Sequence, residues 1–534
     1  MSVSESELER PATMVVRNPA TGESLGELAT TPADQIVDVV DAVAQVQPLW
    51  GLLRLQDRAR YVRRLAQAVI DQFAPLEDLL VREQGRPRAE IATLELLPAL
   101  DALRWIADAG PGVLGQRQLS IHRSMFLAKQ ARVAYEPLGV IGVIGAGSAP
   151  FAQPIAQIAG ALLAGNGVVF KPALRAGLAG EAIAGVLAHA GLPEGLVAIA
   201  HGGAPLGIAL ARSSLQKILF TGSPAVGHEI ARICASENRE VVVESGGKDA
   251  MLLASDAHIA RAVSGALWAS FAGAGQARGS VERIYVHHAV AERFTELLIS
   301  KARALQVGDP LHERTQVGPL ASDRRLQHVQ ELVAQALSEG AQLRCGGPLP
   351  APDGCTGSFY APAVLTGVNN QMRVMREPID GPVVAVMEVA SLEQAIELTN
   401  DCDYTLGASI WSSDRYESLR VAREVNAGMV WCNDHLPAPM ISSGPWGATS
   451  TGGMGRTLGE AGLRACAREK LISWDPSGSR GLWWGPYGRS LTAAARTVAE
   501  LRSGRDQHRE HAWRHGTIEL ARVGVRALRH RDGR

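Results

Sequence analysis

The chain has 534 residues, which is too long for one hydrophobic core, so the sequence predicts at least two domains. It carries 53 Lys and Arg against 54 Asp and Glu, a formal net charge of −1. Because phosphate binding needs a cationic excess, this balance argues against a general nucleic-acid binder. Six cysteines without CxxC spacing indicate reduced thiols, and we expect neither disulfides nor a metal site.

The N-terminus is acidic and lacks the basic region and apolar run of a signal peptide, so we expect a cytoplasmic protein. Residues 138–170 contain no charged residue. This segment is long enough to span a bilayer. Glycines and prolines interrupt it as strand, loop, helix and strand, which favours a buried α/β core.

Strand and helix patterns alternate along most of the chain, which predicts parallel sheets covered by helices. In chain order we expect a strand at 140–144, a helix at 154–163, a strand at 167–170, a helix at 178–190 and a strand at 217–220. Ser223 then suits the N-cap, and Pro224 the first position, of another helix. The turn Gly222-Ser223 would place free amides above the sheet as an anion site, or serve only as a helix cap.

Lysine is scarce, and three of the six lysines lie at these motifs: Lys171, Lys217 and Lys248. For Lys171 we favour contact with a nucleotide over a solvated lysine at a strand end. Lys217 and Lys248 are expected to be structural.

The last sixty or so residues differ in character from the rest. They contain Trp483, Trp484 and Tyr487, followed by arginine-rich helical stretches. We expect this extension, 476–534, to mediate association with another subunit or peripheral contact with an anionic membrane surface. The alternative is a solvated, partly disordered tail.

Several motifs, taken together and in order, resemble the NAD(P)-dependent aldehyde dehydrogenase superfamily over roughly residues 15 to 475. They are RNPATG from residue 17, EPLGV from 136, AGNGVVFKP from 164, FTGS from 220, ESGGK from 244, VGDP from 307, VGPL from 317, MRE from 375 and PWG from 445. The resemblance implies NAD(P)-dependent oxidation of an aldehyde to a carboxylic acid.

The resemblance also implies an α/β fold with four parts. These are a Rossmann-like cofactor domain (1–124 and 138–246), an α/β catalytic-type domain (247–445), a β oligomerisation arm (125–137 and 446–475) and the Arg-rich C-terminal extension (476–534). The extended segment 125–135 matches the family's oligomerisation strand, so we expect a homo-oligomer or a hetero-oligomer with an active homologue.

The catalytic set implied by the resemblance is incomplete. Glu244 matches the general base, but Arg278 stands at the position of the nucleophilic cysteine and Ser148 at that of the oxyanion-binding asparagine. A guanidinium stays protonated and cannot attack a carbonyl carbon. Arg278 and Glu244 are expected to lie close enough to interact. Cys432 is the only conceivable substitute thiol, and we do not favour it.

The cofactor set is also incomplete. Lys171, Gly222 and Ser223 match the adenosine half of the site, whereas Pro378 replaces the glutamate that holds the nicotinamide ribose. Leu174 and Asp380 replace a carboxylate and a phenylalanine of the family pattern. NAD or NADP is the implied cofactor, with binding expected to be weak or lost.

Three hypotheses remain open. The first is a non-catalytic partner subunit or scaffold, in which Glu244 is either a remnant base or a buried carboxylate paired to a cation. The second is a nucleotide or metabolite binder that uses Arg278 as an anion hook. The third is an active oxidoreductase with unusual chemistry.

Overall fold

The computed structural model describes residues 13–121, 128–436, 438–449, 452–476, 481, 483–484 and 487–528. Contacts divide the chain into two compact units. The first, called the body, comprises Met1–Leu114 and Pro137–Arg468, and the second, called the appendage, comprises Gly115–Glu136 and Glu469–Arg534.

A six-stranded sheet forms the first half of the body, in the order β17-β9-β8-β5-β6-β7. The parallel strands are β5 (Val140–Ile144), β6 (Gly167–Lys171), β7 (Val197–Ile199), β8 (Lys217–Gly222) and β9 (Glu240–Ser245). Together with α7 (Ala152–Ala164) and α8 (Gly177–His189), they confirm the five expected elements. Every residue of β5, α7 and β6 is buried, so the strands and the helix of 138–170 belong to the core.

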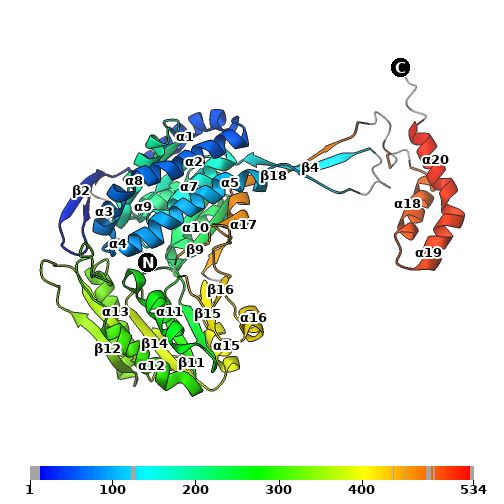
Figure 1. Cartoon of the computed structure of the whole chain (residues 1–534). Coiled ribbons are helices and arrows are strands. Elements are labelled where there is room, and N and C mark those ends of the chain that lie inside the picture. The colour runs from blue at the N-terminus through cyan, green and yellow to red at the C-terminus, as the bar shows by residue number, and fades with distance from the viewer. Residues whose placement is uncertain are drawn as a thin grey trace. The chain divides into compact units, whose positions relative to one another are not determined.

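Helices cover both faces of this sheet (Figure 1). Apolar residues of α1 (Ile36–Gly51), α9 (Ala204–Arg212) and α10 (Pro224–Ser236) share one core cluster with the strands. On α7 pack α2 (Leu55–Asp71) and α5 (Leu97–Asp108). This is the Rossmann-like arrangement that the alternating pattern predicts.

A seven-stranded sheet forms the second half of the body, in the order β12-β13-β14-β11-β10-β15-β16. Its strands are β10 (Asp249–Leu253), β11 (Val281–His287), β12 (Gln342–Leu349), β13 (Phe359–Thr366), β14 (Val383–Val389), β15 (Gly407–Trp411) and β16 (Met429–Cys432). Only the β12–β13 pair is antiparallel. The helices are α11 (Ile259–Phe271), α12 (His288–Arg303), α13 (Asp323–Ser338), α15 (Leu392–Asn400) and α16 (Arg415–Glu424).

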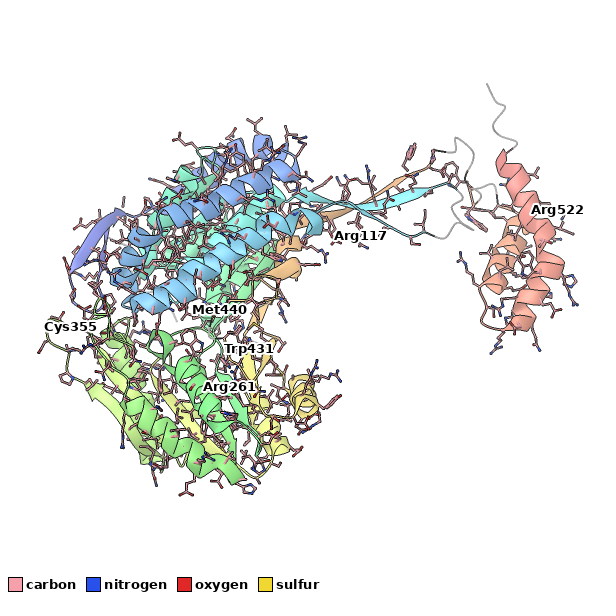
Figure 2. All side chains as sticks on the ribbon, viewed as in Figure 1. Arg117, Arg261, Cys355, Trp431, Met440 and Arg522 are labelled. Atoms are coloured by element: carbon pink, nitrogen blue, oxygen red, sulfur yellow. The ribbon has the colours of Figure 1, made fainter. Side chains whose placement is uncertain are left out.

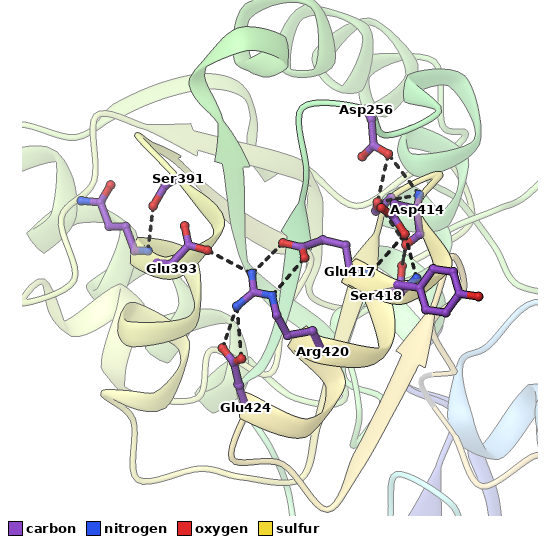
Figure 3. A network of polar contacts seen from close by, with 11 residues as sticks. Asp256, Ser391, Glu393, Asp414, Glu417, Ser418, Arg420 and Glu424 are labelled. Carbon is purple, nitrogen blue, oxygen red and sulfur yellow. Dashed lines mark hydrogen bonds and ion pairs between the residues drawn. The ribbon is translucent and has the colours of Figure 1, made fainter.

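An ion-pair network ties α16 to α15 (Figure 3). Arg420 pairs with Glu417 and Glu424 on its own helix and with Glu393 on α15. Asp414 caps α16 by accepting hydrogen bonds from two backbone amides of the first turn. The ion pairs lie at the surface, where such pairs contribute little to stability.

The structure differs from the expected arm at 446–475. Strand β17 (Gly453–Met454) pairs antiparallel with β9 and so belongs to the six-stranded sheet. The reason is a close approach, since a Cβ added at Gly453 would lie 2.4 Å from the backbone oxygen of Val243. The later residues of 446–475 form β18 (Ala467–Trp474), which joins β4 (Gln130–Pro137) and β3 (Arg117–Gln118) in a three-stranded sheet.

Residues 125–127 of the expected oligomerisation segment lie outside the described residues, whereas its remainder leads into β4. The C-terminal part of the appendage is helical, as expected, with α18 (Arg489–Leu501), α19 (Asp506–His511), a π turn at Ala512–Gly516 and α20 (Thr517–Leu528). Among the described helices none alone has the length and apolar character to cross a membrane; one bent pair, α2 together with Ala33–Gly51, passes that test by length and composition.

Candidate active site

The residues at the family's base and nucleophile positions meet at the carboxyl end of the six-stranded sheet. Glu244 is near the end of β9, and Arg278 follows α11 and a short 3-10 turn, Ala272–Gly275. Only 1% of the Glu244 side chain and 5% of the Arg278 side chain are exposed. Both groups therefore interact with little screening by water.

Arg278 faces Glu244, as expected. Its Nε lies 3.5 Å from Glu244 Oε1, and its Nη1 donates a hydrogen bond of 3.0 Å to the Glu244 backbone oxygen. Burial lowers the pKa of Arg278, and the Glu244 carboxylate opposes that shift. Arginine nevertheless stays protonated in proteins. The nucleophile position is therefore occupied by a buried cation.

Three further donors hold the Glu244 carboxylate. Trp446 Nε1 donates to Oε1 at 2.9 Å, while Gln153 Nε2 and Thr457 Oγ1 donate to Oε2 at 2.5 and 2.8 Å. A general base must reach the proton that it abstracts. Here both carboxylate oxygens already accept protein donors, which agrees with the interpretation of Glu244 as a buried carboxylate paired to a cation.

Sequence reasoning missed these three donors. Gln153 and Gln157 lie four residues apart on the otherwise apolar helix α7, and such a spacing puts two polar groups on one helix face. This pair of polar residues on an apolar helix could have predicted a polar contact such as the one from Gln153 to Glu244. Trp446 lies in the PWG motif, which carried no assigned role, and Thr457 has no local signal.

The segment bearing Arg278 is fixed on two sides. A Cβ added at Gly275, which has φ of +68°, would lie 2.1 Å from the backbone oxygen of Gly381, so only glycine fits there. On the other side, Nε2 of the buried His435 lies 2.9 Å from the Gly279 backbone oxygen. Trp431, labelled in Figure 2, packs against the His435 ring with centroids 4.7 Å apart.

Ser148 lies in the turn between β5 and α7 and is partly buried. In the described part of the chain no hydrogen bond joins Ser148 to Arg278 or Glu244. Beside it, a Cβ added at Gly147 would meet only Ala173 within 4 Å. A role of Ser148 as an oxyanion donor stays a prediction.

Lys171, which the resemblance assigns to the adenosine end of a cofactor site, is buried. Lys171 ends β6, is 6% exposed, and donates through Nζ to the Pro172 oxygen at 3.0 Å. Burial lowers the pKa of Lys171 to about 8. The alternative of a solvated lysine at a strand end is therefore wrong, and nucleotide contact stays a prediction.

The turn Gly222-Ser223 leads into α10, with Ser223 at the N-cap and Pro224 in the first turn, as expected. The Ser223 side chain makes no capping hydrogen bond. The first-turn amides are therefore not capped by this side chain and suit an anion such as a phosphate.

A buried carboxylate holds the loop that carries Pro378 and Asp380, the residues expected at the nicotinamide end. Glu282 accepts hydrogen bonds from the backbone amides of Ile379 and Asp380 and pairs with Lys248 Nζ at 2.6 Å. Lys248 is fully buried, so its role is structural, as expected. Lys217 likewise pairs with Glu240, at 2.8 Å.

Pro378 and Asp380 offer little to a nicotinamide ribose. The Pro378 ring has no polar atom, and its backbone oxygen lies 2.9 Å from His328 Nε2. Asp380 has φ of +48° and pairs with Arg325 at 2.6 Å. The residues present therefore fit the adenosine and phosphate half of a dinucleotide and do not fit its nicotinamide half.

Cys432 is not brought into this site. Its Sγ lies 3.9 Å from the Ser418 oxygen on α16, and burial raises the pKa of the thiol. A raised pKa lowers the thiolate fraction that a nucleophile needs. The structure therefore offers no support for Cys432 as a substitute thiol.

A small pocket, partly open to solvent, lies beside Thr457, one of the Glu244 donors. Thr457 and Gln157 are in its wall, and Gln157 Oε1 has no hydrogen-bond partner. The apolar lining includes Trp105, Ile106, Ala156, Gly160, Leu219 and Leu463. Arg278 is not among the lining residues.

Comparisons with known proteins agree with this architecture. Residues 6–472 match the model of the aldehyde dehydrogenase family. The chain is 31% identical over 459 residues to betaine aldehyde dehydrogenase of Brucella anthropi, covering 85% of this chain and 92% of that protein. It is also 31% identical over 465 residues to the Cereibacter sphaeroides enzyme of that name, covering 87% and 94%.

Solved structures show the same fold. A putative aldehyde dehydrogenase from Burkholderia cenocepacia superposes with a TM-score of 0.84 at 28% identity, covering 89% of this chain and 96% of that one. An aldehyde dehydrogenase from Mycobacterium tuberculosis, complexed with NAD+, gives 0.81 at 29% identity, covering 87% and 95%.

Proposed function

The chain belongs to the aldehyde dehydrogenase family, and from that premise we propose that it is a non-catalytic member acting as a partner subunit. One observation carries the proposal: the position of the nucleophile holds Arg278, buried against the Glu244 carboxylate. Losing a covalent nucleophile costs on the order of a million-fold in turnover. No described thiol replaces it.

The Arg278 guanidinium also argues against the second hypothesis, a metabolite binder with an anion hook. A hook must present its charge to the ligand, whereas this group is 5% exposed and points toward a carboxylate. A buried pair of this kind closes space that a substrate would use, and breaking it costs several kcal/mol.

Dinucleotide binding is proposed to be weak. The adenosine end keeps Lys171 and the α10 N-terminus, but the nicotinamide end lacks a ribose contact at Pro378. NAD+ should therefore bind no more tightly than ADP-ribose, which lacks the nicotinamide. A ligand at a hundred times its dissociation constant stabilises a fold by about 2.7 kcal/mol, so melting shifts will show the difference. A clear shift at low micromolar NAD+ would refute weak binding.

The partner is proposed to be a second copy or an active homologue, joined through the β4 and β18 arm. Co-purification from the native cell, followed by identification of associated chains, tests this. Recovery of the chain as a monomer without a homologue would refute it.

The remaining alternative is an active oxidoreductase of the family's substrate class. It is tested by NADH and NADPH formation over a panel of aldehydes, including betaine aldehyde, the substrate named for the two relatives. We expect no activity above a no-enzyme blank. Turnover with any aldehyde would establish this alternative and overturn the non-catalytic proposal.

A further inference from the structure

Charge is divided unequally between the two units. The appendage holds 17 Lys and Arg against 8 Asp and Glu, and the body holds 36 against 46. The nearly neutral chain therefore combines an appendage of net charge +9 with a body of −10. A strongly cationic unit attracts an anionic surface.

The helices of the appendage pack on a small apolar core. Leu491 and Ala494 of α18 and Val523 of α20 are buried, with Trp483 and Leu520 packed against them. The apolar residues on the inward face of α20 are therefore buried in this core.

The outward face of α20 is apolar as well. Ile518 and Val525 are 60% and 46% exposed, and residues seven apart lie on the same side of a helix. Leu520 and Val523 lie on the opposite side. Trp513, 67% exposed, precedes Ile518 by five residues across the π turn, a spacing that one π turn aligns. We call Trp513, Ile518 and Val525 the outer stripe.

The outer face of α18 is different. Its exposed residues are Arg489, Thr492, Ala495, Arg496 and Ala499, which are small or polar. Of these two helices, only α20 therefore carries large apolar side chains that are exposed.

Arginines border the outer stripe. Arg522 lies between Ile518 and Val525 along the helix and is 64% exposed, and Arg514 is 69% exposed (Figure 2 labels Arg522). Each pairs with an acidic residue of its own helical segment, Glu519 and Glu510. Long arginine stems can lie along apolar surroundings while the guanidinium stays at a polar boundary.

The size of the stripe distinguishes between partners. Together with the π turn that carries Trp513, the helix runs over residues 512–528 and is about 26 Å long and about 10 Å wide, so its outer face offers roughly 260 Å². A stable protein interface needs about 800 Å² from each partner. A lipid surface needs no such matched area, because shallow insertion of an apolar face combines with attraction to anionic headgroups.

We propose that the outer stripe, on α20 and the π turn before it, docks the appendage on an anionic lipid surface, with Trp513, Ile518 and Val525 entering the interface and Arg514 and Arg522 meeting the lipid phosphates. This docking goes beyond the proposed function and does not depend on it.

The test is sedimentation of the full-length protein with vesicles. We expect binding to vesicles of phosphatidylcholine with phosphatidylserine, little binding to phosphatidylcholine alone, and loss of binding as salt is raised. Replacing the stripe (W513A, I518S and V525S together) should reduce partitioning at least tenfold. The matched control, A495S with A499S on the outer face of α18, should partition like the wild type.

A second variant guards against misfolding of the first. Arg522→Gln keeps the exposed helix intact and should lower partitioning about fivefold, the effect of about 1 kcal/mol for one surface cation. Equal binding to neutral and anionic vesicles, or no binding to either, overturns the proposal. So does a stripe variant that binds vesicles normally but changes the oligomeric state by light scattering, since that result assigns the stripe to a second copy.

Discussion

Lys248 Nζ lies 2.6 Å from Glu282 Oε2, and both side chains are almost completely buried. The same carboxylate accepts the backbone amides of Ile379 and Asp380. The Glu282 carboxylate thus joins the loop that carries Lys248 to the loop that carries Ile379 and Asp380.

Replacing Lys248 by methionine should therefore lower the free energy of unfolding by about 3 to 5 kcal/mol, because Glu282 would be left as an uncompensated buried charge. Urea denaturation measures the change. Adding Glu282→Gln should recover part of the loss, since an amide oxygen can still accept a hydrogen bond from Ile379 or Asp380. A double variant no more stable than Lys248→Met would contradict this account.

Glu83 predicts a pH dependence of stability. Burial raises its pKa to about 7, although the backbone amides of Leu178 and Ala179 donate to it and oppose the shift. In the unfolded chain a glutamate titrates near about 4.3. Because the folded pKa is the higher one, the folded state keeps the proton longer, and stability falls as pH rises from about 4.3 to about 7.

The measurement is the difference in unfolding free energy between wild type and Glu83→Gln at several pH values. Wild type should lose stability relative to the variant as pH rises through this window. The exposed Glu237→Gln serves as control. A difference that stays constant between pH 5 and pH 8 would show that Glu83 does not titrate as described.

The sequence predicted β5, α7, β6, α8 and β8, because buried strands and helices of this kind are short apolar runs between glycines and prolines, but it did not predict β7 or α9. The contact of Arg278 with Glu244 followed from the family resemblance. The donors Trp446 and Thr457 lie 202 and 213 residues from Glu244 along the chain, and only the folded sheet brings them together. Strand β17 is two residues long, too short to show a periodic pattern.

Replacing Gly160 by alanine is expected to stabilise the fold. It lies inside α7, where a Cβ would meet Leu463 Cδ1 at 3.7 Å and Cys466 Sγ at 3.9 Å, both ordinary contacts. Glycine costs about 0.5 to 1 kcal/mol relative to alanine in a helix interior. Gly160→Ala should raise the free energy of unfolding by about this amount and raise the melting temperature.

Gly462, which lines the same pocket, is the matched control. A Cβ there would lie 2.3 Å from the Thr457 backbone carbon, so Gly462→Ala should destabilise the fold. Destabilisation by Gly160→Ala would show that the space beside α7 is not available to a methyl group.

Lys171 predicts proton uptake on nucleotide binding. With its pKa lowered to about 8 by burial, a substantial fraction of the ammonium is neutral at pH 8.5. A phosphate near Lys171 would favour the charged form. Titration calorimetry of ADP-ribose in two buffers of different ionisation enthalpy should therefore show uptake of a fraction of a proton, absent in Lys171→Met. Binding without proton uptake would place the nucleotide away from Lys171.

The last prediction is that Arg278→Cys will not restore aldehyde oxidation. The new thiol would lie beside Glu244, but Glu244 would still accept hydrogen bonds from Gln153, Trp446 and Thr457. Groups that act as a unit contribute little until the unit is complete.

The comparison that tests this is Arg278→Cys alone beside Arg278→Cys combined with Ser148→Asn, Pro378→Glu and Asp380→Phe, assayed for NADH formation with simple aldehydes. The combined variant would regain an oxyanion donor and a ribose contact. In other enzymes, loss of an oxyanion donor lowers turnover about a hundred- to a thousand-fold. We therefore expect any activity in the combined variant and not in the single one. Strong activity of the single variant would mean that aldehyde oxidation needs neither an asparagine in place of Ser148 nor a glutamate in place of Pro378. Activity in neither would point to the turn at Gly147, which leads into α7, the helix that carries Gln153.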